Sequence, residues 1–262
     1  MLNLSELTEK VRILAIEAGD FIREERKKFH REAIEKKHAH DYVSYVDKES
    51  EKKIVTRLKE LLPEAGFIAE EGSGTLNDEQ YCWLVDPLDG TTNFIHDNAP
   101  YCVSIALRSK KELLLGVVYE ICRNECFWTY KGAPSYLNGN EIHVSAISNL
   151  DDSFIALGFP YATEEYKPMA NHLVNTLYGN VAGLRLMGAA AVELCYIAAG
   201  RFEARIEAFI GPWDIAAGTI ILQNAGGMIT DFKGGDSYSS GSQVLASNGR
   251  IHRDLLNIID NL

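Results

Sequence analysis

Long apolar runs are missing from this sequence. None of its hydrophobic stretches reaches the roughly 20 residues that a membrane-spanning helix needs. Its first residues, MLNLSELTEKVRILAIEAGDFIREERKKFH, also lack the basic start and continuous apolar centre of a secretory signal peptide. We therefore expect a cytoplasmic protein that has no membrane partner.

Positive charge is scarce as well. The 262 residues contain 26 Lys and Arg against 37 Asp and Glu, which gives a formal net charge of -11. A surface that follows the phosphates of DNA or RNA needs clustered basic side chains. We therefore expect no nucleic-acid partner, and an anionic ligand must be met locally, by a metal ion or by backbone N–H groups.

Cysteine is infrequent and odd in number, with five residues. Cys122 and Cys126 have a spacing that loosely resembles a metal site, but no His or second Cys pair accompanies them. We interpret the five as buried thiols. They are Cys82, Cys102, Cys122, Cys126 and Cys195.

Helical spacing of apolar residues marks the start of the chain. It predicts an amphipathic helix from about Leu4, with Asn3 and Glu6 as a capping pair, and a second helix from about Lys48 to Leu62. These helices would form a hairpin whose connection carries Asp47. The basic part of that connection contains Lys36, Lys37, His38 and His40 and is interpreted as a solvated loop. A mobile basic loop that helps to recruit phosphate to a nearby site is the alternative.

The remainder of the chain changes period twice. Short aromatic and β-branched runs from GFIAEEG to ECFWTYKG predict a largely antiparallel sheet. From about residue 151, strands and helices alternate, which predicts an α/β region that includes VAGLRLMG as a strand. We expect one domain over residues 1–262, with subregions of about 1–145 and 146–262.

Acidic side chains follow apolar runs where elements end. The segment WLVDPLDGTTNF places two carboxylates three residues apart directly before a turn, and such charges repel each other unless a cation or strong donors lie between them. Asp47 and Asp214 have the simpler interpretation of helix caps, and Glu70 that of an exposed loop residue. The acidic candidates are Asp47, Glu70, Glu71, Asp86, Asp89 and Asp214.

Taken together, the acidic residues predict a site for a hard cation. Oxygen ligands without a His or Cys set suit Mg²⁺, and paired ions assist phosphoryl transfer. Gly90, Thr91 and Thr92 would offer backbone N–H groups to a phosphate at the start of a helix, although a simple turn is the alternative. A Thr hydroxyl paired with Asp47 would deprotonate a water. The residues thus indicate a Mg²⁺-dependent phosphate-ester hydrolase.

The motifs DYVSYVD, EEG, DPLDGTTNF and WDIAAG, in this order, resemble those of the inositol monophosphatase family, and the resemblance covers nearly the whole chain. It implies an α+β fold, a layered αβαβα sandwich of the inositol monophosphatase and fructose-1,6-bisphosphatase type. It also implies a lithium-sensitive phosphatase that binds two or three Mg²⁺ ions, with Mn²⁺ as a possible substitute, and usually forms a homodimer.

The resemblance also implies residue roles. Glu70, Asp86 and the Leu88 carbonyl would hold the first metal, and Glu70 a third, weaker ion. The second metal would take Asp86, Asp89 and Asp214, whereas Glu71 would not be a ligand. Thr91 with Asp47 would activate the water. The substrate contacts would come from Asp89, Gly90, Thr91, Gly188, Ala189, Ala190, Glu207 and Asp214.

The substrate is less closely defined by the resemblance. A small phosphate ester is expected, with myo-inositol monophosphate as the first choice. NADP, fructose 1,6-bisphosphate and adenosine 3',5'-bisphosphate are alternatives, for which Lys167, Arg185 or Arg201 would supply charge. Ala189 stands where inositol-specific relatives often have Thr. Gly188, Ala189 and Ala190 have helix packing as an alternative role, and Glu207 has that of a surface charge at a sheet edge. A further alternative is a non-catalytic binding or regulatory module.

Overall fold

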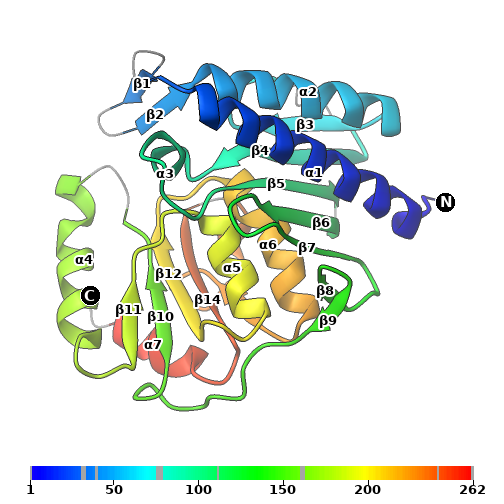
Figure 1. Ribbon diagram of the computed structural model, residues 1–262. Coiled ribbons are helices and arrows are strands. Elements are labelled where there is room, and N and C mark those ends of the chain that lie inside the picture. Colours follow the sequence, from blue (N-terminus) through cyan, green and yellow to red (C-terminus); the bar gives the residue numbers. More distant parts are fainter. Residues whose placement is uncertain are drawn as a thin grey trace.

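The chain opens with α1 (Leu4–Lys28), an amphipathic helix that is blue in the computed structural model of Figure 1. Asn3 caps its start, because the Asn3 side chain accepts a hydrogen bond from the Glu6 N–H at 3.3 Å. The predicted helix and its capping pair are therefore confirmed. The structure describes residues 2–30, 34–38, 41–74, 79–110, 112–159, 163–240 and 242–260.

The connection after α1 is not a plain loop. It contains a two-stranded antiparallel hairpin, β1 (Ile34–His38) and β2 (Asp41–Ser44), so the loop interpretation of this segment was wrong. The side chains of Lys36, Lys37, His38 and His40 lie outside the described part of the structure. The difference arises because strands pair through backbone N–H and C=O groups, so a highly charged sequence can also form a hairpin.

The second helix, α2 (Tyr45–Leu61), begins three residues earlier than predicted. Ser44 is its N-cap, and its side chain accepts a hydrogen bond from the Val46 N–H at 3.1 Å. Asp47 closes the capping box by accepting from the Ser44 N–H at 2.9 Å. Asp47 therefore lies in the first turn of α2 rather than in the connection, and the capping residue is Ser44.

A seven-stranded sheet forms the first β layer, in the order β3-β4-β5-β6-β7-β8-β9. Only β3 and β4 run parallel, so the predicted, largely antiparallel sheet is confirmed. The strands are β3 (Gly66–Ala69), β4 (Tyr81–Asp89), β5 (Cys102–Ser109), β6 (Leu113–Glu120), β7 (Glu125–Tyr130), β8 (Ser135–Leu137) and β9 (Asn140–Ile142). The short helix α3 (Thr91–Ile95) follows β4.

A five-stranded mixed sheet forms the second β layer, in the order β11-β10-β12-β14-β13. Its strands are β10 (Phe154–Leu157), β11 (Gly183–Arg185), β12 (Ala204–Ala208), β13 (Met228–Thr230) and β14 (Gln243–Ser247). The helices of this half are α4 (Thr163–Leu177), α5 (Ala190–Ala198), α6 (Pro212–Asn224), the 3₁₀ turn η2 (Ser237–Ser240) and α7 (His252–Ile259). The strand predicted for VAGLRLMG is shorter than expected, because only its central residues Gly183–Arg185 pair with β10.

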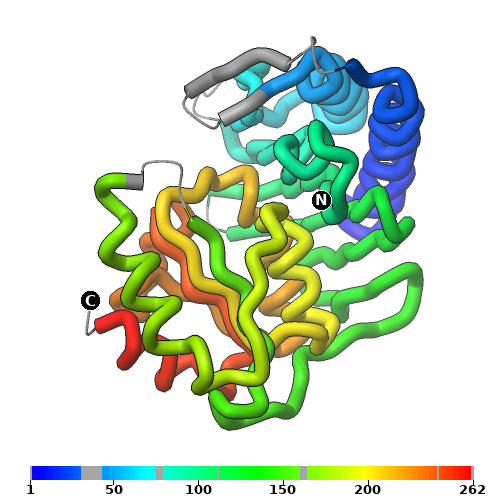
Figure 2. Tube along the Cα trace, turned by 60° about the vertical axis from the view of Figure 1, so that its left-hand side comes forward, coloured from blue at the N-terminus to red at the C-terminus, as the bar shows by residue number. Residues whose placement is uncertain are grey.

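The layers alternate between helices and sheets, as Figures 1 and 2 show. Helices α1 and α2 cover one face of the seven-stranded sheet, α5 and α6 lie between the two sheets, and α4 and α7 cover the outer face of the five-stranded sheet. The central helices are apolar on almost every side, which suits a helix covered by sheets on two sides. The predicted αβαβα sandwich is confirmed.

The burial of the cysteines decides a further expectation. Four of the five cysteines are buried and all are free, but Cys122 is exposed, so its interpretation as a buried thiol was wrong. Cys122 lies in the turn between β6 and β7, outside the apolar core. Among the described residues, no helix combines the length and apolar character needed to cross a membrane.

Candidate active site

Three carboxylates from distant parts of the sequence converge at one place. Glu70 follows β3, Asp86 lies in β4, and Asp214 lies in the first turn of α6. A side-chain oxygen of each lies within 4.8 Å of the others. This donor set contains only carboxylates, which fits a hard cation such as Mg²⁺.

The local structure holds these carboxylates in place. Glu51, a buried residue of α2, accepts hydrogen bonds from the N–H groups of Glu71 (2.7 Å) and Ser73 (2.9 Å), and thereby fixes the turn that carries Glu70. Asp214 accepts from the Gly211 N–H at 2.8 Å, which closes the first turn of α6. The capping interpretation of Asp214 is therefore correct in part, although Gly211 occupies the N-cap.

A β-bulge in β4 lets Asp86 and Asp89 reach the same cavity. Residues three apart on a regular strand point to opposite faces. Here Asp86 lies opposite Ser104 and Asp89 opposite Cys102, so β4 contains one extra residue between the two pairs. The extra residue restores the same face for both carboxylates, and Pro87 is compatible with this irregular stretch.

The proximity of these acids perturbs their protonation. Burial raises the pKa of Asp86 well above its usual range, and the charges of Glu70, Asp89 and Asp214 raise it further. Burial raises the pKa of Asp89 to about 7, with a further contribution from Asp214, while the Ala191 N–H opposes the shift. A bound cation would favour the ionised forms of the same groups, so the cluster fits a metal ion electrostatically.

Asp89 has a structural partner that the sequence did not reveal. Its two carboxylate oxygens accept hydrogen bonds from the N–H groups of Ala190 (3.1 Å) and Ala191 (2.7 Å), at the start of α5. The N-cap residue Ala189 has no side-chain oxygen for this purpose. Asp89, which belongs to the neighbouring β layer, thus takes the place of an N-cap side chain for α5. This contact joins the two halves of the fold.

The predicted catalytic pair lies in hydrogen-bond contact. The Thr91 hydroxyl is 2.9 Å from Asp47 Oδ1 and 3.0 Å from the Leu88 carbonyl oxygen. Burial raises the pKa of Asp47, and hydrogen bonds from Ser44 and Thr91 oppose that effect. The Ser44 N–H and hydroxyl both donate to Asp47 Oδ2, at 2.9 and 2.6 Å, so Oδ1 keeps a fixed direction toward Thr91.

Gly90 forms the predicted turn between β4 and α3. It is the N-cap of α3 and has a φ of 92°, in the left-handed region that glycine tolerates best. A Cβ at this position would lie 2.9 Å from the Pro100 carbonyl oxygen and 3.3 Å from the Ala189 Cβ. The turn can therefore approach its neighbours closely only because position 90 is glycine.

One cavity of about 500 Å³ brings most of the predicted site together. Asp47 is not part of the cavity wall but accepts a hydrogen bond from Thr91, which is. Ala189 is buried behind the wall, beside Gly90. Trp213 forms part of the wall. The predicted residues that line the cavity are Glu70, Asp86, Leu88, Asp89, Gly90, Thr91, Thr92, Gly188, Ala190, Glu207 and Asp214.

An ionic network in the cavity wall was missed by sequence reasoning. The Arg205 guanidinium is paired with both Glu193 and Glu207. Glu193 also accepts hydrogen bonds from the N–H groups of Met187 (3.1 Å) and Gly188 (3.2 Å), which shapes the segment after β11. The available signal was the presence of charged residues in two otherwise apolar patterns, Glu193 in VELC and both Arg205 and Glu207 in ARIEA.

The comparisons with known proteins agree with this geometry. Residues 3–261 match the model of the inositol monophosphatase family. The chain is 39% identical over 225 residues to the Nus factor SuhB of Pasteurella multocida, covering 85% of this chain and 84% of that protein.

Two solved structures are similar over nearly their whole length. The extragenic suppressor protein suhB of Bartonella henselae has a TM-score of 0.90 and 32% identity, covering 96% of this chain and 97% of that one. Inositol monophosphatase from Anabaena has a TM-score of 0.89 and 30% identity, covering 100% and 98%. The chain therefore belongs to the inositol monophosphatase family.

Proposed function

We propose that this protein is a Mg²⁺-dependent phosphatase that hydrolyses a small phosphate monoester, with myo-inositol monophosphate as the leading substrate. The convergence of Glu70, Asp86 and Asp214 beside the Thr91–Asp47 pair is the observation that carries the proposal. An all-carboxylate site next to a hydroxyl–carboxylate pair suits hydrolysis by an activated water.

Each group in the site has a proposed task. Glu70, Asp86 and the Leu88 carbonyl would hold one ion, Asp86, Asp89 and Asp214 a second, and Glu70 with water a third. Such ions, when bound, acidify water and neutralise phosphate charge. Two or three Mg²⁺ ions, or Mn²⁺ in their place, are expected.

The proton would pass through Thr91. Its hydroxyl donates to Asp47 Oδ1 and keeps lone pairs for a water in the cavity. Burial makes Asp47 a stronger base than a solvated carboxylate, because it raises the pKa. Asp47 therefore takes the Thr91 proton while Thr91 takes one from the water. The Gly90 and Thr91 N–H groups would bind the phosphate.

The charges of the cavity favour a monophosphate of a neutral polyol. Arg205 is the only Lys or Arg among the described residues that line it, and Glu193 and Glu207 already neutralise this cation. Its Nη1 is buried and makes no hydrogen bond to the described residues. That donor, together with the Glu207 carboxylate, suits the hydroxyl groups of a polyol better than a second phosphate.

The cations considered for a second phosphate lie elsewhere. Arg201 pairs with Glu125 at 2.6 and 2.8 Å, and Arg185 lies over the Phe154 ring at 4.5 Å from its centre. Lys167 is exposed on α4. None of the three lines the described wall of the cavity. This arrangement disfavours NADP, fructose 1,6-bisphosphate and adenosine 3',5'-bisphosphate.

Phosphate release from these esters, measured with and without Mg²⁺ and Li⁺, tests the proposal. We expect Mg²⁺-dependent release that Asp89→Asn abolishes and the exposed control Asp254→Asn leaves unchanged. Glu207→Gln should raise the KM for inositol phosphate but not for p-nitrophenyl phosphate, which has no hydroxyl groups. Unchanged release by Asp89→Asn would refute the site, and equal effects on both substrates would refute the role of Glu207.

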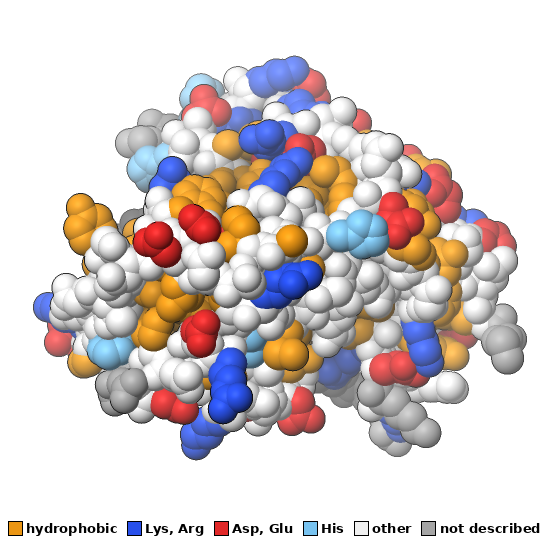
Figure 3. All heavy atoms as spheres, turned by 90° about the horizontal axis from the view of Figure 1, so that it is seen from below, with side chains coloured by type: hydrophobic (Ala, Val, Ile, Leu, Met, Phe, Trp, Pro, Cys, Tyr) orange, Lys and Arg blue, Asp and Glu red, His pale blue; other side chains and the backbone are white. Residues whose placement is uncertain are grey.

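A non-catalytic regulatory role is the second candidate, because relatives at 38 to 39% identity carry the name Nus factor SuhB. In the view of Figure 3, basic side chains are interspersed with acidic ones. This face therefore offers no basic stretch for nucleic acid. Absence of phosphate release from every ester tested would favour the regulatory role.

The proposal extends to the oligomeric state of the protein and to its cellular location. We propose a cytoplasmic homodimer, in line with the family resemblance. Light scattering on the purified protein tests the dimer, since a monomer at micromolar concentration would contradict it.

A further inference from the structure

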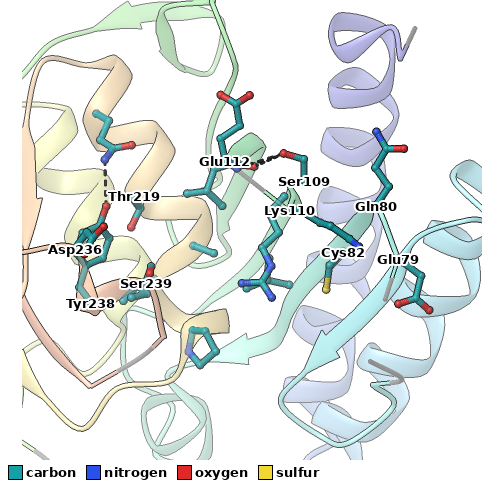
Figure 4. A pocket seen from close by; sticks show the side chains of 17 residues that line it. Glu79, Gln80, Cys82, Ser109, Lys110, Glu112, Thr219, Asp236, Tyr238 and Ser239 are labelled. Carbon is teal, nitrogen blue, oxygen red and sulfur yellow. Dashed lines mark hydrogen bonds between the residues drawn. The ribbon is translucent and has the colours of Figure 1, made fainter. Parts of the chain in front are cut away.

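A second cavity, of about 630 Å³, lies against a different face of α6 from the carboxylate cluster. We call it the α6 cavity. Pro212, Ile215, Ala216, Thr219 and Gln223 contribute from that face of α6. Figure 4 shows Thr219 and Tyr238 on one side, and Cys82 of β4 and Lys110, which follows β5, on the other.

A cation without a partner carboxylate lines the α6 cavity. Arg108 is half-buried at the end of β5, and no carboxylate of the described residues forms an ion pair with it. Glu112, which lines the same cavity, pairs instead with Lys131 at 2.6 Å. Burial raises the pKa of the Cys82 thiol, and the nearby Arg108 charge opposes that effect. Arg108 also forms a hydrogen bond with the Cys82 side chain, and the Glu79 and Asp236 carboxylates line the same cavity. The other N–H groups of its guanidinium can donate to an anion.

A buried hydroxyl at the same cavity also lacks a partner. Thr219 is 2% exposed, and its Oγ1 makes no hydrogen bond to the described residues. A buried polar group without a partner is costly, and such groups are rare in folded proteins. A ligand oxygen in the cavity would supply the missing bond.

The rest of the wall is suited to an apolar ring. Leu84, Leu113, Ile215 and Ala216 contribute aliphatic surface. The Tyr238 phenol closes one side and accepts a hydrogen bond from the Gln223 amide at 3.4 Å. Small-molecule sites commonly combine such apolar walls with a few polar groups that fix the orientation.

We propose that the α6 cavity binds a small organic anion, whose carboxylate contacts Arg108 and Thr219 and whose ring packs on the aliphatic wall. This site is separate from the proposed phosphatase site and does not depend on it. A ligand there would contact Pro212 and Ile215, which flank Asp214 in the first turn of α6.

Calorimetric titration of the whole protein with 1-naphthoate tests this site, and 1-naphthalenemethanol serves as the uncharged control ligand. We expect saturable binding of 1-naphthoate to the wild type. Arg108→Gln should bind it about tenfold more weakly, because a charge-assisted hydrogen bond is lost. Thr219→Val should also bind it more weakly. The exposed control Arg253→Gln should bind like the wild type.

A second arm separates the two cavities. Saturating inorganic phosphate with Mg²⁺ should leave 1-naphthoate binding unchanged, because phosphate is expected at the carboxylate cluster. Displacement by phosphate would overturn the proposal, as would absence of binding to the wild type or equal affinity for the uncharged ligand. Wild-type affinity of both Arg108→Gln and Thr219→Val would also overturn it, provided that circular dichroism shows both variants folded.

Discussion

At the residue scale, the Thr91 hydroxyl connects the cavity to Asp47. Thr91→Val removes this hydroxyl while keeping a side chain of similar shape, so kcat should fall by about 10² to 10⁴, the usual range for general acid–base catalysis. KM should change little. Thr91→Ser keeps the hydroxyl and should retain most of the activity. Steady-state kinetics would contradict the role if the Val and Ser variants were equally active.

Asp89 gives the metal-free protein a distinctive pH dependence. Its pKa of about 7 lies above the unfolded value near 3.8, so the neutral acid stabilises the fold. That contribution is complete below pH 3.8 and is lost as the pH rises to about 7. In EDTA, the free energy of unfolding of the wild type relative to Asp89→Asn should therefore decrease across this window.

The Asn variant is the necessary reference for this measurement. Burial lowers the pKa of His252 to about 4, so His252 destabilises the fold as the pH falls below 6.5 and opposes the trend from Asp89. Both proteins contain His252, and the difference between their urea-unfolding free energies cancels it. A difference that does not vary with pH would show that Asp89 is not perturbed.

The carboxylates of the cluster can be recognised from the sequence more easily than the ionic network in the cavity wall. Asp86 and Asp89 follow an apolar strand directly, so their position alone predicts a cleft. Arg205 lies within a strand pattern where an outward charge is ordinary, and its partner Glu193 is distant in the sequence. Long-range pairing of this type depends on how layers stack, which local pattern does not contain.

At the scale of elements, α6 rests closely on the seven-stranded sheet because β6 has a glycine beneath it. A Cβ on Gly116 would lie 2.6 Å from the Ala217 carbonyl oxygen. Gly116→Ala should therefore lower the free energy of unfolding by about 1–3 kcal/mol, the usual cost of overpacking a core. Urea denaturation measures this change.

Asn140→Ala, at an exposed position of β9, is the control for this substitution and should have a much smaller effect. A Gly116→Ala variant as stable as the wild type would contradict the close contact. Because Asp214 lies at the start of α6, the position of this helix also sets the geometry of the carboxylate cluster.

Periodicity predicted most helices and strands, but not where they begin and end. The central helices were expected from the alternation of strands and helices after residue 151. The β1–β2 hairpin was missed because the sequences IEKKH and DYVS show no regular alternation of apolar and polar residues, and the start of α2 depends on the Ser44–Asp47 capping box. The end of β11 depends on pairing with β10, which the sequence of one strand does not determine.

At the scale of the whole molecule, the net charge of the protein and the charge of its active-site cavity both disfavour substrates that carry more than one phosphate. A protein with a net charge of -11 repels polyanions at long range, and among the described residues that line the active-site cavity the one cation, Arg205, is already paired. We expect kcat/KM for inositol monophosphate to exceed that for fructose 1,6-bisphosphate and NADP. The difference should shrink at high salt, because salt screens the long-range part. A preference for NADP would contradict this expectation.

The Mg²⁺ dependence of phosphate release from myo-inositol monophosphate, measured for the wild type and Asp86→Asn, tests the metal-assisted mechanism most directly. Asp86 lies at the centre of the cluster, so the variant should lose release by about 10² or more, the scale of a removed transition-state contact. The wild type should be inactive in EDTA and regain activity with Mg²⁺. Release that persists in EDTA, or that Asp86→Asn leaves unchanged, would contradict the mechanism.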